Sequence, residues 1–156
     1  MTQYDAIVIG TGQAGPSMAT RLAGEGFKTA IIERGKFGGT CVNNGCVPTK
    51  TLIASARAAH VARHADDYGV MIEGPVRVDM KQVKARKDKI SGNSTHSVEQ
   101  WLKETDNLTV YHGTGKFESS HTVRVGDELL QADKNSSMWA DMHWFPHFPG
   151  WMISII

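Results

Sequence analysis

The sequence has little cysteine and no excess of charge of either sign. Two cysteines in 156 residues are too few for a fold held together by several disulfides. The 17 Lys and Arg residues nearly balance the 16 Asp and Glu residues, for a formal net charge of +1. The cysteine count therefore excludes a disulfide-scaffolded mini-protein, and the charge balance gives no reason to expect a nucleic-acid partner.

Long hydrophobic runs are also missing. The first apolar run covers only residues 6–9, and no basic segment precedes it, so we expect no secretory signal. No stretch approaches the roughly 20 apolar residues that are needed to cross a bilayer. We therefore expect no membrane partner and a cytoplasmic location, where a cysteine pair is more often catalytic, redox-active or metal-binding than structural.

No internal repeat or low-complexity linker divides the chain, and its length suits one domain. Residues 4–9 and 28–33 are rich in β-forming apolar residues and predict two buried strands. Between them lie a glycine-rich turn and a helix over residues 17–23, with Pro16 in its first turn. This order predicts a βαβ unit with parallel strands and a right-handed crossover.

Composition and turn residues predict the remaining elements. Together with the βαβ unit they predict an α/β fold, in which a Rossmann-type parallel sheet carries a small antiparallel β-meander. We expect a loop over residues 34–40, helices over 45–66 and 78–104 with a break at 91–93, and strands over 108–117 and 122–130.

The glycine-rich turn carries a binding motif. Residues 10–15 read G-x-G-x-x-G directly after a buried strand and at the start of a helix. In this context Gly10 permits the tight turn, Gly12 lets the backbone approach a pyrophosphate, and Gly15 lets the helix pack closely on the strand. Glu33 ends the second strand, where an acid accepts hydrogen bonds from a ribose. The motif predicts a dinucleotide site but does not distinguish FAD from NAD.

Two cysteines, Cys41 and Cys46, form the second motif. A five-residue offset in a regular helix puts side chains about 140° apart, and a disulfide needs Cα atoms within about 7 Å. A bond between them therefore requires a distorted helix start, which the Asn-Asn-Gly segment at residues 43–45 can supply. Both sulfurs then lie near a helix N-terminus, with Lys50 one turn beyond Cys46, and we expect both features to lower the thiol pKa.

The residues alone leave other uses of the cysteines open. They could be two buried small side chains, or half of a zinc site, although no second cysteine pair exists and the C-x4-C spacing is less usual for zinc. A thioredoxin-like pair would instead read C-x-x-C. Redox use is the interpretation that we favour.

Residues 38–50 resemble the redox-active disulfide motif of the class I pyridine nucleotide-disulfide oxidoreductases, G-G-x-C-x-x-x-G-C-x-P. This family includes dihydrolipoamide dehydrogenase, glutathione reductase and mercuric reductase. Its dinucleotide fingerprint is similar to residues 10–15 with Glu33, and its G-x-G-x-F strand is similar to residues 113–117. The resemblance covers residues 4–134.

The resemblance implies that residues 1–134 are a FAD-binding domain of a flavoprotein NAD(P)H-dependent disulfide or mercuric reductase. Electrons would pass from NAD(P)H through the flavin to a Cys41–Cys46 disulfide, with Cys46 nearer the flavin and Cys41 exchanging with the substrate. The substrate would be a small disulfide, a dithiol or a metal ion, and the active form a homodimer. The FAD-contacting positions that the resemblance implies are Gly10, Gly12, Ala14, Gly15, Glu33, Gly39, Thr40, Lys50 and Gly115.

Several features of that family are not found in this sequence. They are a second G-x-G-x-x-G, a later G-D segment that completes the FAD site, and a C-terminal domain with a His–Glu pair. Residues 135–156 instead hold three of the four Trp and three of the seven Met. We interpret them as an atypical, non-native tail, such as a frameshifted end; a further strand and loop of the domain, or a surface-binding aromatic segment, remain open. The alternative functions are therefore a truncated, inactive remnant and a dinucleotide-binding module with inert cysteines.

Two further clusters are expected to be solvated surface. His60 and His64 are one helical turn apart but have no evident third metal ligand. Five basic residues lie near Asp79 and Asp88 without interleaved aromatic residues, which is typical of a solvated helix face. We therefore assign no metal site and no nucleic-acid surface. The five basic residues are Lys81, Lys84, Arg86, Lys87 and Lys89.

Overall fold

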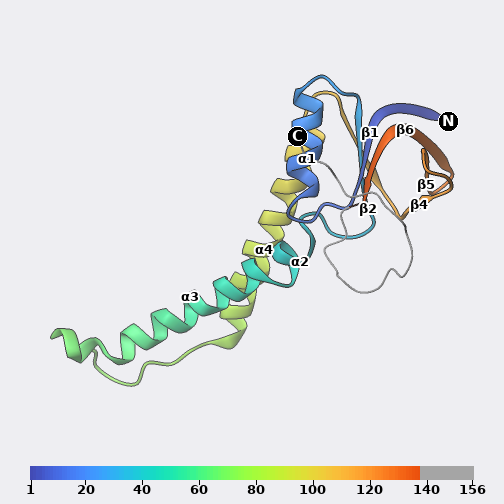
Figure 1. Cartoon of the computed structure of the whole chain (residues 1–156). Helices are drawn as coiled ribbons and strands as arrows, with labels where there is room; N and C mark the ends of the chain where they lie inside the picture. The colour runs from blue at the N-terminus through green and yellow to red at the C-terminus, as the bar shows by residue number, and fades with distance from the viewer. Residues whose placement is uncertain (138–156) are drawn as a thin grey trace.

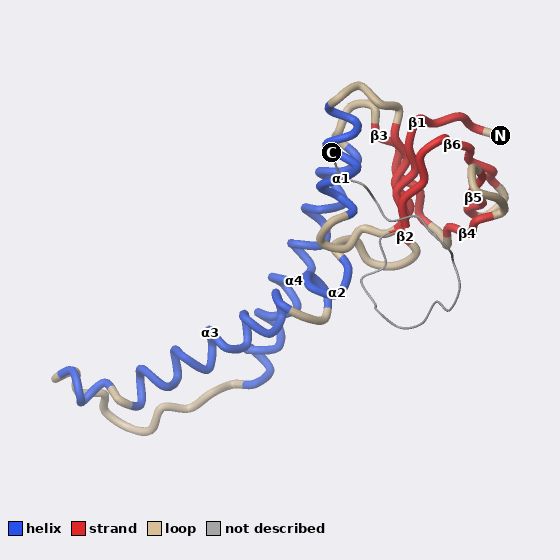
Figure 2. Tube along the Cα trace, viewed as in Figure 1, coloured by secondary structure: helices blue, strands red, loops and turns tan. Residues whose placement is uncertain are grey.

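The computed structural model describes the backbone of residues 1–137 and the side chains of residues 1–133. Six strands form one sheet in the order β3-β2-β1-β6-β5-β4, and two helices leave the sheet as a long arm (Figures 1 and 2). The strands are β1 (Thr2–Ile9), β2 (Thr29–Glu33), β3 (Leu108–His112), β4 (Gly115–Phe117), β5 (Thr122–Val125) and β6 (Glu128–Ser137). The helices are α1 (Gly15–Gly24), α2 (Gly39–Asn43), α3 (Cys46–Arg63), the 3-10 helix η1 (Ala65–Tyr68) and α4 (Met80–Lys103).

The sheet has a parallel part and an antiparallel part. β3, β2, β1 and β6 run parallel to their neighbours, whereas β6, β5 and β4 form an antiparallel meander. The predicted βαβ unit is β1–α1–β2, with Ala6 opposite Thr29 and Ile9 opposite Ile32. The structure therefore confirms the α/β fold with a Rossmann-type parallel sheet and a small meander.

The parallel strands are buried on both faces, as their nearly continuous apolar sequence predicts. On one face Val8 and Ile31 pack with side chains of α1 and with Leu102 of α4. On the other face Ile7 and Ile32 pack with side chains of β5 and β6, because the sheet curls and brings the meander over it. Full burial of an aliphatic side chain stabilises a fold by roughly 1.5–3 kcal/mol, so these two clusters hold the sheet in place.

The helical arm consists of α3, η1 and the first half of α4, and it extends away from the sheet (Figures 1 and 2). α3 and α4 are in contact along the arm: Arg86 Nη1 donates to the carbonyl oxygen of Thr51 at 3.0 Å and to Ser55 Oγ at 3.4 Å. Asp79 caps α4, since its carboxylate accepts from two backbone N–H groups of the first turn. Among the described residues, no helix is long and apolar enough to cross a membrane.

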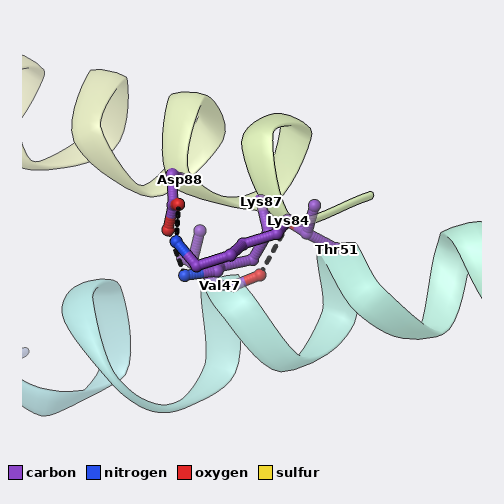
Figure 3. Close-up of polar contacts among 5 residues, drawn as sticks. All are labelled: Val47, Thr51, Lys84, Lys87 and Asp88. Atoms are coloured by element: carbon purple, nitrogen blue, oxygen red, sulfur yellow. Dashed lines mark hydrogen bonds and ion pairs between the residues drawn. The ribbon is translucent and has the colours of Figure 1, made fainter. Parts of the chain in front are cut away.

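The basic cluster of α4 is largely a solvated face, as predicted: Lys81, Lys84, Arg86 and Lys89 are exposed, and Lys87 is partly buried. Figure 3 shows Lys84 and Lys87 reaching Asp88 beside Val47 and Thr51 of α3. Lys84 Nζ lies 2.5 Å from one oxygen of Asp88, and Lys87, whose side chain is 25% exposed, pairs with the other oxygen. The one departure from a fully solvated face is therefore the partial burial of Lys87.

The expected helix break at residues 91–93 is wrong, because α4 continues through them. Ser94 and Thr95 donate to the carbonyl oxygens of Ile90 and Ser91, so these hydroxyls are satisfied within the helix. Thr95, which follows the segment, also donates to the side chain of Asn43 in α2 at 2.8 Å, and tertiary contacts of this kind can override a low helix propensity.

The two strands expected after α4 are each divided. Residues 108–117 form β3 and β4, which lie at opposite ends of the strand order, so the chain leaves one edge of the curled sheet and joins the other. Residues 122–130 divide into β5 and β6 at Gly126 and Asp127, which are the turn-forming residues of this segment in the sequence. β6 then passes the expected boundary at residue 134 and pairs with β1 as far as Ser137. The rest of the tail lies outside the described residues.

Candidate functional site

The fingerprint loop, residues 10–15, joins β1 to α1 (Figure 1). Gly10 has a φ of +102°, a backbone conformation that residues with a Cβ rarely adopt. A Cβ on Gly15 would lie 2.0 Å from the carbonyl oxygen of Gly10, so only glycine fits where α1 begins. Both residues thus have the conformational roles that the motif predicts.

The N-terminus of α1 offers backbone donors to an anion. Its N-cap residue, Ala14, makes no side-chain cap, and no acidic residue lies in the first turn. Gln13 and Ala14 are exposed, whereas Gly15 is buried. Because the first N–H groups of a helix lack partners within it and the helix dipole favours a negative charge there, this donor set fits a pyrophosphate.

Glu33 lies beside the fingerprint loop at the end of β2 and is 9% exposed. One carboxylate oxygen, Oε2, accepts from the backbone N–H of Thr11 at 2.8 Å and from its hydroxyl at 2.5 Å. The other oxygen, Oε1, accepts from the N–H of Gly35 at 2.8 Å. A carboxylate has about four acceptor positions, so Glu33 retains capacity for the predicted ribose hydroxyl.

The segment expected to be a loop at residues 34–40 ends in a short helix, α2, which carries Cys41. α3 begins at Cys46, so the helix is interrupted at Asn44 and Gly45, within the segment that the cysteine spacing predicts to be distorted. Asn43 stabilises this arrangement, since its side-chain amide donates to the carbonyl oxygens of two preceding residues at 2.9 Å each. The interruption places the two thiols within interaction distance of each other.

Both cysteines are free thiols in the structure, with Cys41 half-buried and Cys46 exposed. A hydrogen bond with Cys46 raises the pKa of the Cys41 thiol; partial burial and repulsion from a Cys46 thiolate add to this rise. The charge of Lys50 lowers the pKa of Cys41, but by less than the other effects raise it. The expectation of a lowered pKa is therefore wrong for Cys41, because the nearby second thiol outweighs the helix terminus and the lysine.

The cysteine segment packs directly on the fingerprint loop. A Cβ on Gly39, which has a φ of +60°, would lie 2.8 Å from the Cα of Gly12. The N–H of Gly38 donates to the hydroxyl of Thr11 at 3.3 Å in a buried hydrogen bond. The two sequence motifs therefore form one site in which backbone approaches backbone without intervening side chains.

The other predicted positions lie near this site. Thr40 and Lys50 are exposed on the cysteine segment and on the first turns of α3. A Cβ on Gly115 would lie 3.3 Å from the side chain of Ile32 and 3.4 Å from that of Ile9. Gly115 is thus packed over the ends of β1 and β2, from which the fingerprint loop and Glu33 follow.

Two residues of the site, Thr11 and Thr95, were not predicted, and the hydrogen bonds of Asn43 were not predicted either, although its segment was expected to distort the helix. Thr11 links Glu33 to the cysteine segment, and Asn43 accepts a hydrogen bond at 2.8 Å from Thr95 of α4. The position of Asn43 before a glycine turn was the available signal, since asparagine side chains commonly bond to nearby backbone. Among the described residues, no group of three or more His, Cys, Asp or Glu gathers around a possible metal position.

Residues 4–135 match the protein family described as pyridine nucleotide-disulphide oxidoreductase. The chain is 35% identical over 129 residues to dihydrolipoyl dehydrogenase of Acholeplasma laidlawii. The alignment covers 83% of this chain and 38% of that enzyme. It is also 34% identical over 132 residues to dihydrolipoyl dehydrogenase of Bacillus subtilis strain 168. That alignment covers 81% of this chain and 29% of that enzyme. The solved Cu(II) complex of the HOCl-induced flavoprotein disulfide reductase RclA from Escherichia coli matches with a TM-score of 0.76 at 28% identity, over 96% of this chain and 31% of that chain.

The chain thus spans about a third of the length of these relatives. The family match nevertheless includes the fingerprint loop, Glu33, both cysteines and Gly115 within one continuous segment. The chain belongs to the pyridine nucleotide-disulphide oxidoreductase family.

Proposed function

We propose that this chain is the FAD-binding, redox-cysteine part of a flavoprotein NAD(P)H-dependent disulfide reductase. The observation that supports this most directly is the contact between its two motifs. Gly39 packs on Gly12, and Gly38 donates to Thr11, so the thiol pair lies beside a loop suited to a pyrophosphate. A dinucleotide module with inert cysteines would have no need of this juxtaposition.

Bound FAD would supply two-electron chemistry between a nicotinamide and a cysteine pair. The N–H groups at the start of α1 would hold its pyrophosphate, Gly12 would let it approach the backbone, and Glu33 would accept from a ribose hydroxyl. These assignments use donors and acceptors that the structure exposes or leaves with spare capacity. Thr40, Lys50 and Gly115 would complete the contacts.

Cys41 and Cys46 would form a disulfide on oxidation, with loss of two electrons and two protons, and reopen on reduction. We assign Cys46 to the position nearer the flavin and Cys41 to exchange with the substrate. The raised pKa of Cys41 agrees with this division, because a protonated Cys41 can donate a hydrogen bond to a Cys46 thiolate. Lys50 would favour the negative charge of the pair.

The substrate is proposed to be a small disulfide, a dithiol or a metal ion, and the partner a second copy of the whole protein. The proposed compartment is the cytoplasm, where thiols are kept reduced between turnovers. These assignments rest on membership in the family.

Two measurements on the purified chain test the proposal. Peptide mapping after treatment with a mild oxidant should find the peptides of Cys41 and Cys46 linked, whereas Cys46→Ser should give no linked peptide. Titration with FAD, followed by flavin fluorescence, should show weak but saturable binding, because the later G-D segment that completes the FAD site in the family is not found in this sequence. Two free thiols under oxidant would contradict the redox role, and no saturable binding would contradict the cofactor role.

A further inference from the structure

The side chain of Thr11 contacts both motifs of the site. Its hydroxyl donates to Glu33 Oε2 at 2.5 Å and accepts from the N–H of Gly38 at 3.3 Å. Thr11 is fully buried, and Glu33 nearly so, so water does not readily replace either bond. One hydroxyl therefore joins the acid at the end of β2 to the N-cap of α2, the helix that carries Cys41.

The direction of the hydrogen bonds is set by the chemistry of the groups. A hydroxyl has one proton to donate and two acceptor positions. The Glu33 carboxylate only accepts when ionised, and the Gly38 N–H only donates, so the proton of Thr11 is directed to Glu33 and a lone pair to Gly38. These two hydrogen bonds thus connect the Glu33 carboxylate to the backbone of Gly38 through one hydroxyl.

α2 depends on such anchors because it is short. It has five residues and no side-chain cap, and helices of this length are not stable on their own in water. It is held by the contact of Gly39 with Gly12, by the burial of Val42 and by the bond from Gly38 to Thr11. The hydrogen bonds of the Asn43 side chain also restrain it. Loosening the Thr11 bond would free its N-terminus and expose Cys41 more often.

We propose that Thr11 is a positioning residue that couples occupancy of the nucleotide-ribose site to the exposure of Cys41. The inference rests on the proposed function, since it takes Glu33 as the ribose acceptor. A ribose hydroxyl bound to Glu33 restrains the carboxylate, the carboxylate restrains the Thr11 hydroxyl, and Thr11 holds the N-terminus of α2 closed. Because a ligand favours the state that it binds better, the bound nucleotide reduces the opening of α2.

The experiment uses ADP as the probe, because it carries the ribose and pyrophosphate but no flavin that could cover the thiols. The reduced full chain is treated with N-ethylmaleimide, and modification of the Cys41 peptide is followed by mass spectrometry with and without saturating ADP. We expect ADP to slow modification roughly fivefold or more and to slow amide hydrogen exchange of residues 38–42. Thr11→Ser should behave in the same way. Thr11→Val is compared at an ADP concentration that saturates this variant, as measured by calorimetry, and there ADP should no longer slow the modification.

Each outcome decides the matter. If calorimetry finds no binding of ADP to the wild-type chain, the nucleotide site of the proposed function fails, and this inference with it. If ADP binds but leaves Cys41 modification unchanged, or slows it equally in Thr11→Val, the coupling through Thr11 is wrong and the proposed function stands. If Thr11→Val does not fold, Thr11→Ala takes its place. Hydrogen exchange on the wild-type chain needs no variant: if ADP leaves the exchange rate of the Gly38 amide unchanged, the inference is wrong.

Discussion

Among single residues, Cys41 has the most informative chemistry, because its neighbours act on its pKa in opposite directions. Cys46 raises the pKa of Cys41 through a hydrogen bond and charge repulsion, whereas Lys50 lowers it. We expect Cys46→Ala to lower the pH midpoint of Cys41 alkylation and Lys50→Met to raise it, since the thiolate is the reactive form. Both midpoints are obtained from the alkylation rate of the Cys41 peptide, measured between about pH 6 and 10, a range that brackets the ordinary thiol pKa. Midpoints that move in the same direction would contradict this account.

Glu33 combines a structural and a predicted binding role. Its carboxylate accepts three hydrogen bonds from Thr11 and Gly35, and a ribose would add a fourth. We expect Glu33→Ala to weaken FAD binding by about 1.5–3 kcal/mol, the typical contribution of a hydrogen bond to a charged group. Glu25→Ala, which removes an exposed acid paired with Arg21, is the matched control and should leave the affinity unchanged. Equal affinities of the two variants would exclude Glu33 from the site.

The site residues that could be predicted are those whose role depends on local backbone. Gly10 and Gly15 are required by a turn and a close contact within a few residues, and the cysteine spacing predicts the interrupted helix. Thr11 and Thr95 could not be predicted, because their partners Gly38 and Asn43 lie 27 and 52 residues away. A hydroxyl becomes informative only when the fold brings a distant donor or acceptor to it.

At the level of elements, α4 offers a direct test of glycine within a helix. A Cβ on Gly92 would meet no heavy atom within 4 Å beyond the backbone of its own helix, whereas a Cβ on Gly15 in α1 would meet the Gly10 carbonyl oxygen at 2.0 Å. We expect Gly92→Ala to raise the free energy of unfolding by about 0.5–1 kcal/mol, since alanine restricts the unfolded chain and favours the helix. Gly15→Ala should lower it. Urea unfolding followed by circular dichroism measures both, and a destabilised Gly92→Ala would show a hidden contact of α4.

The ion pairs of α4 make the stability of the arm depend on pH. Hydrogen bonds from Lys84 and Lys87 hold the pKa of Asp88 at about 2, below the unfolded value of roughly 3.9. The ionised carboxylate therefore stabilises the folded chain above about pH 4, and this contribution is lost as the pH falls toward 2. We expect Asp88→Asn to lower Tm at pH 7 but not near pH 2.

The control for this prediction is Asp67→Asn, which removes the same charge from the exposed end of the arm. It should leave Tm unchanged at pH 7. A Tm difference between Asp88→Asn and the wild-type chain that persists at pH 2 would show that the ion pairs are not its cause.

The elements themselves could be predicted where the sequence has a regular pattern. The apolar runs of β1 and β2 and the turn between them determine the βαβ unit locally. The bounds of α4 were predicted to within two residues, but its continuity was not. Ser91 and Gly92 disfavour a helix, and tertiary contacts such as the hydrogen bond from Thr95 to Asn43 of α2 compensate. The division between β3 and β4 likewise results from the curl of the whole sheet.

The whole molecule is a compact sheet domain with a long, exposed helical arm (Figures 1 and 2). Apolar side chains remain exposed on α3, including Ile53 at 59% and Val61 at 52%, and Met71, in the segment between η1 and α4, is 84% exposed. Exposed apolar side chains that lie close together on one element favour association in water. The arm is therefore the part of the described chain from which self-association is expected.

Substitution of these apolar residues tests this expectation. We expect the double variant Ile53→Lys and Val61→Lys to reduce concentration-dependent association in sedimentation velocity, because two apolar side chains of α3 are replaced by solvated charges. Its Tm should change little, since neither residue belongs to the buried clusters of the sheet. Thr49→Lys adds a charge to an exposed position of α3 without removing an apolar side chain. If Thr49→Lys reduces association as much as the double variant, charge repulsion and not the apolar surface controls it.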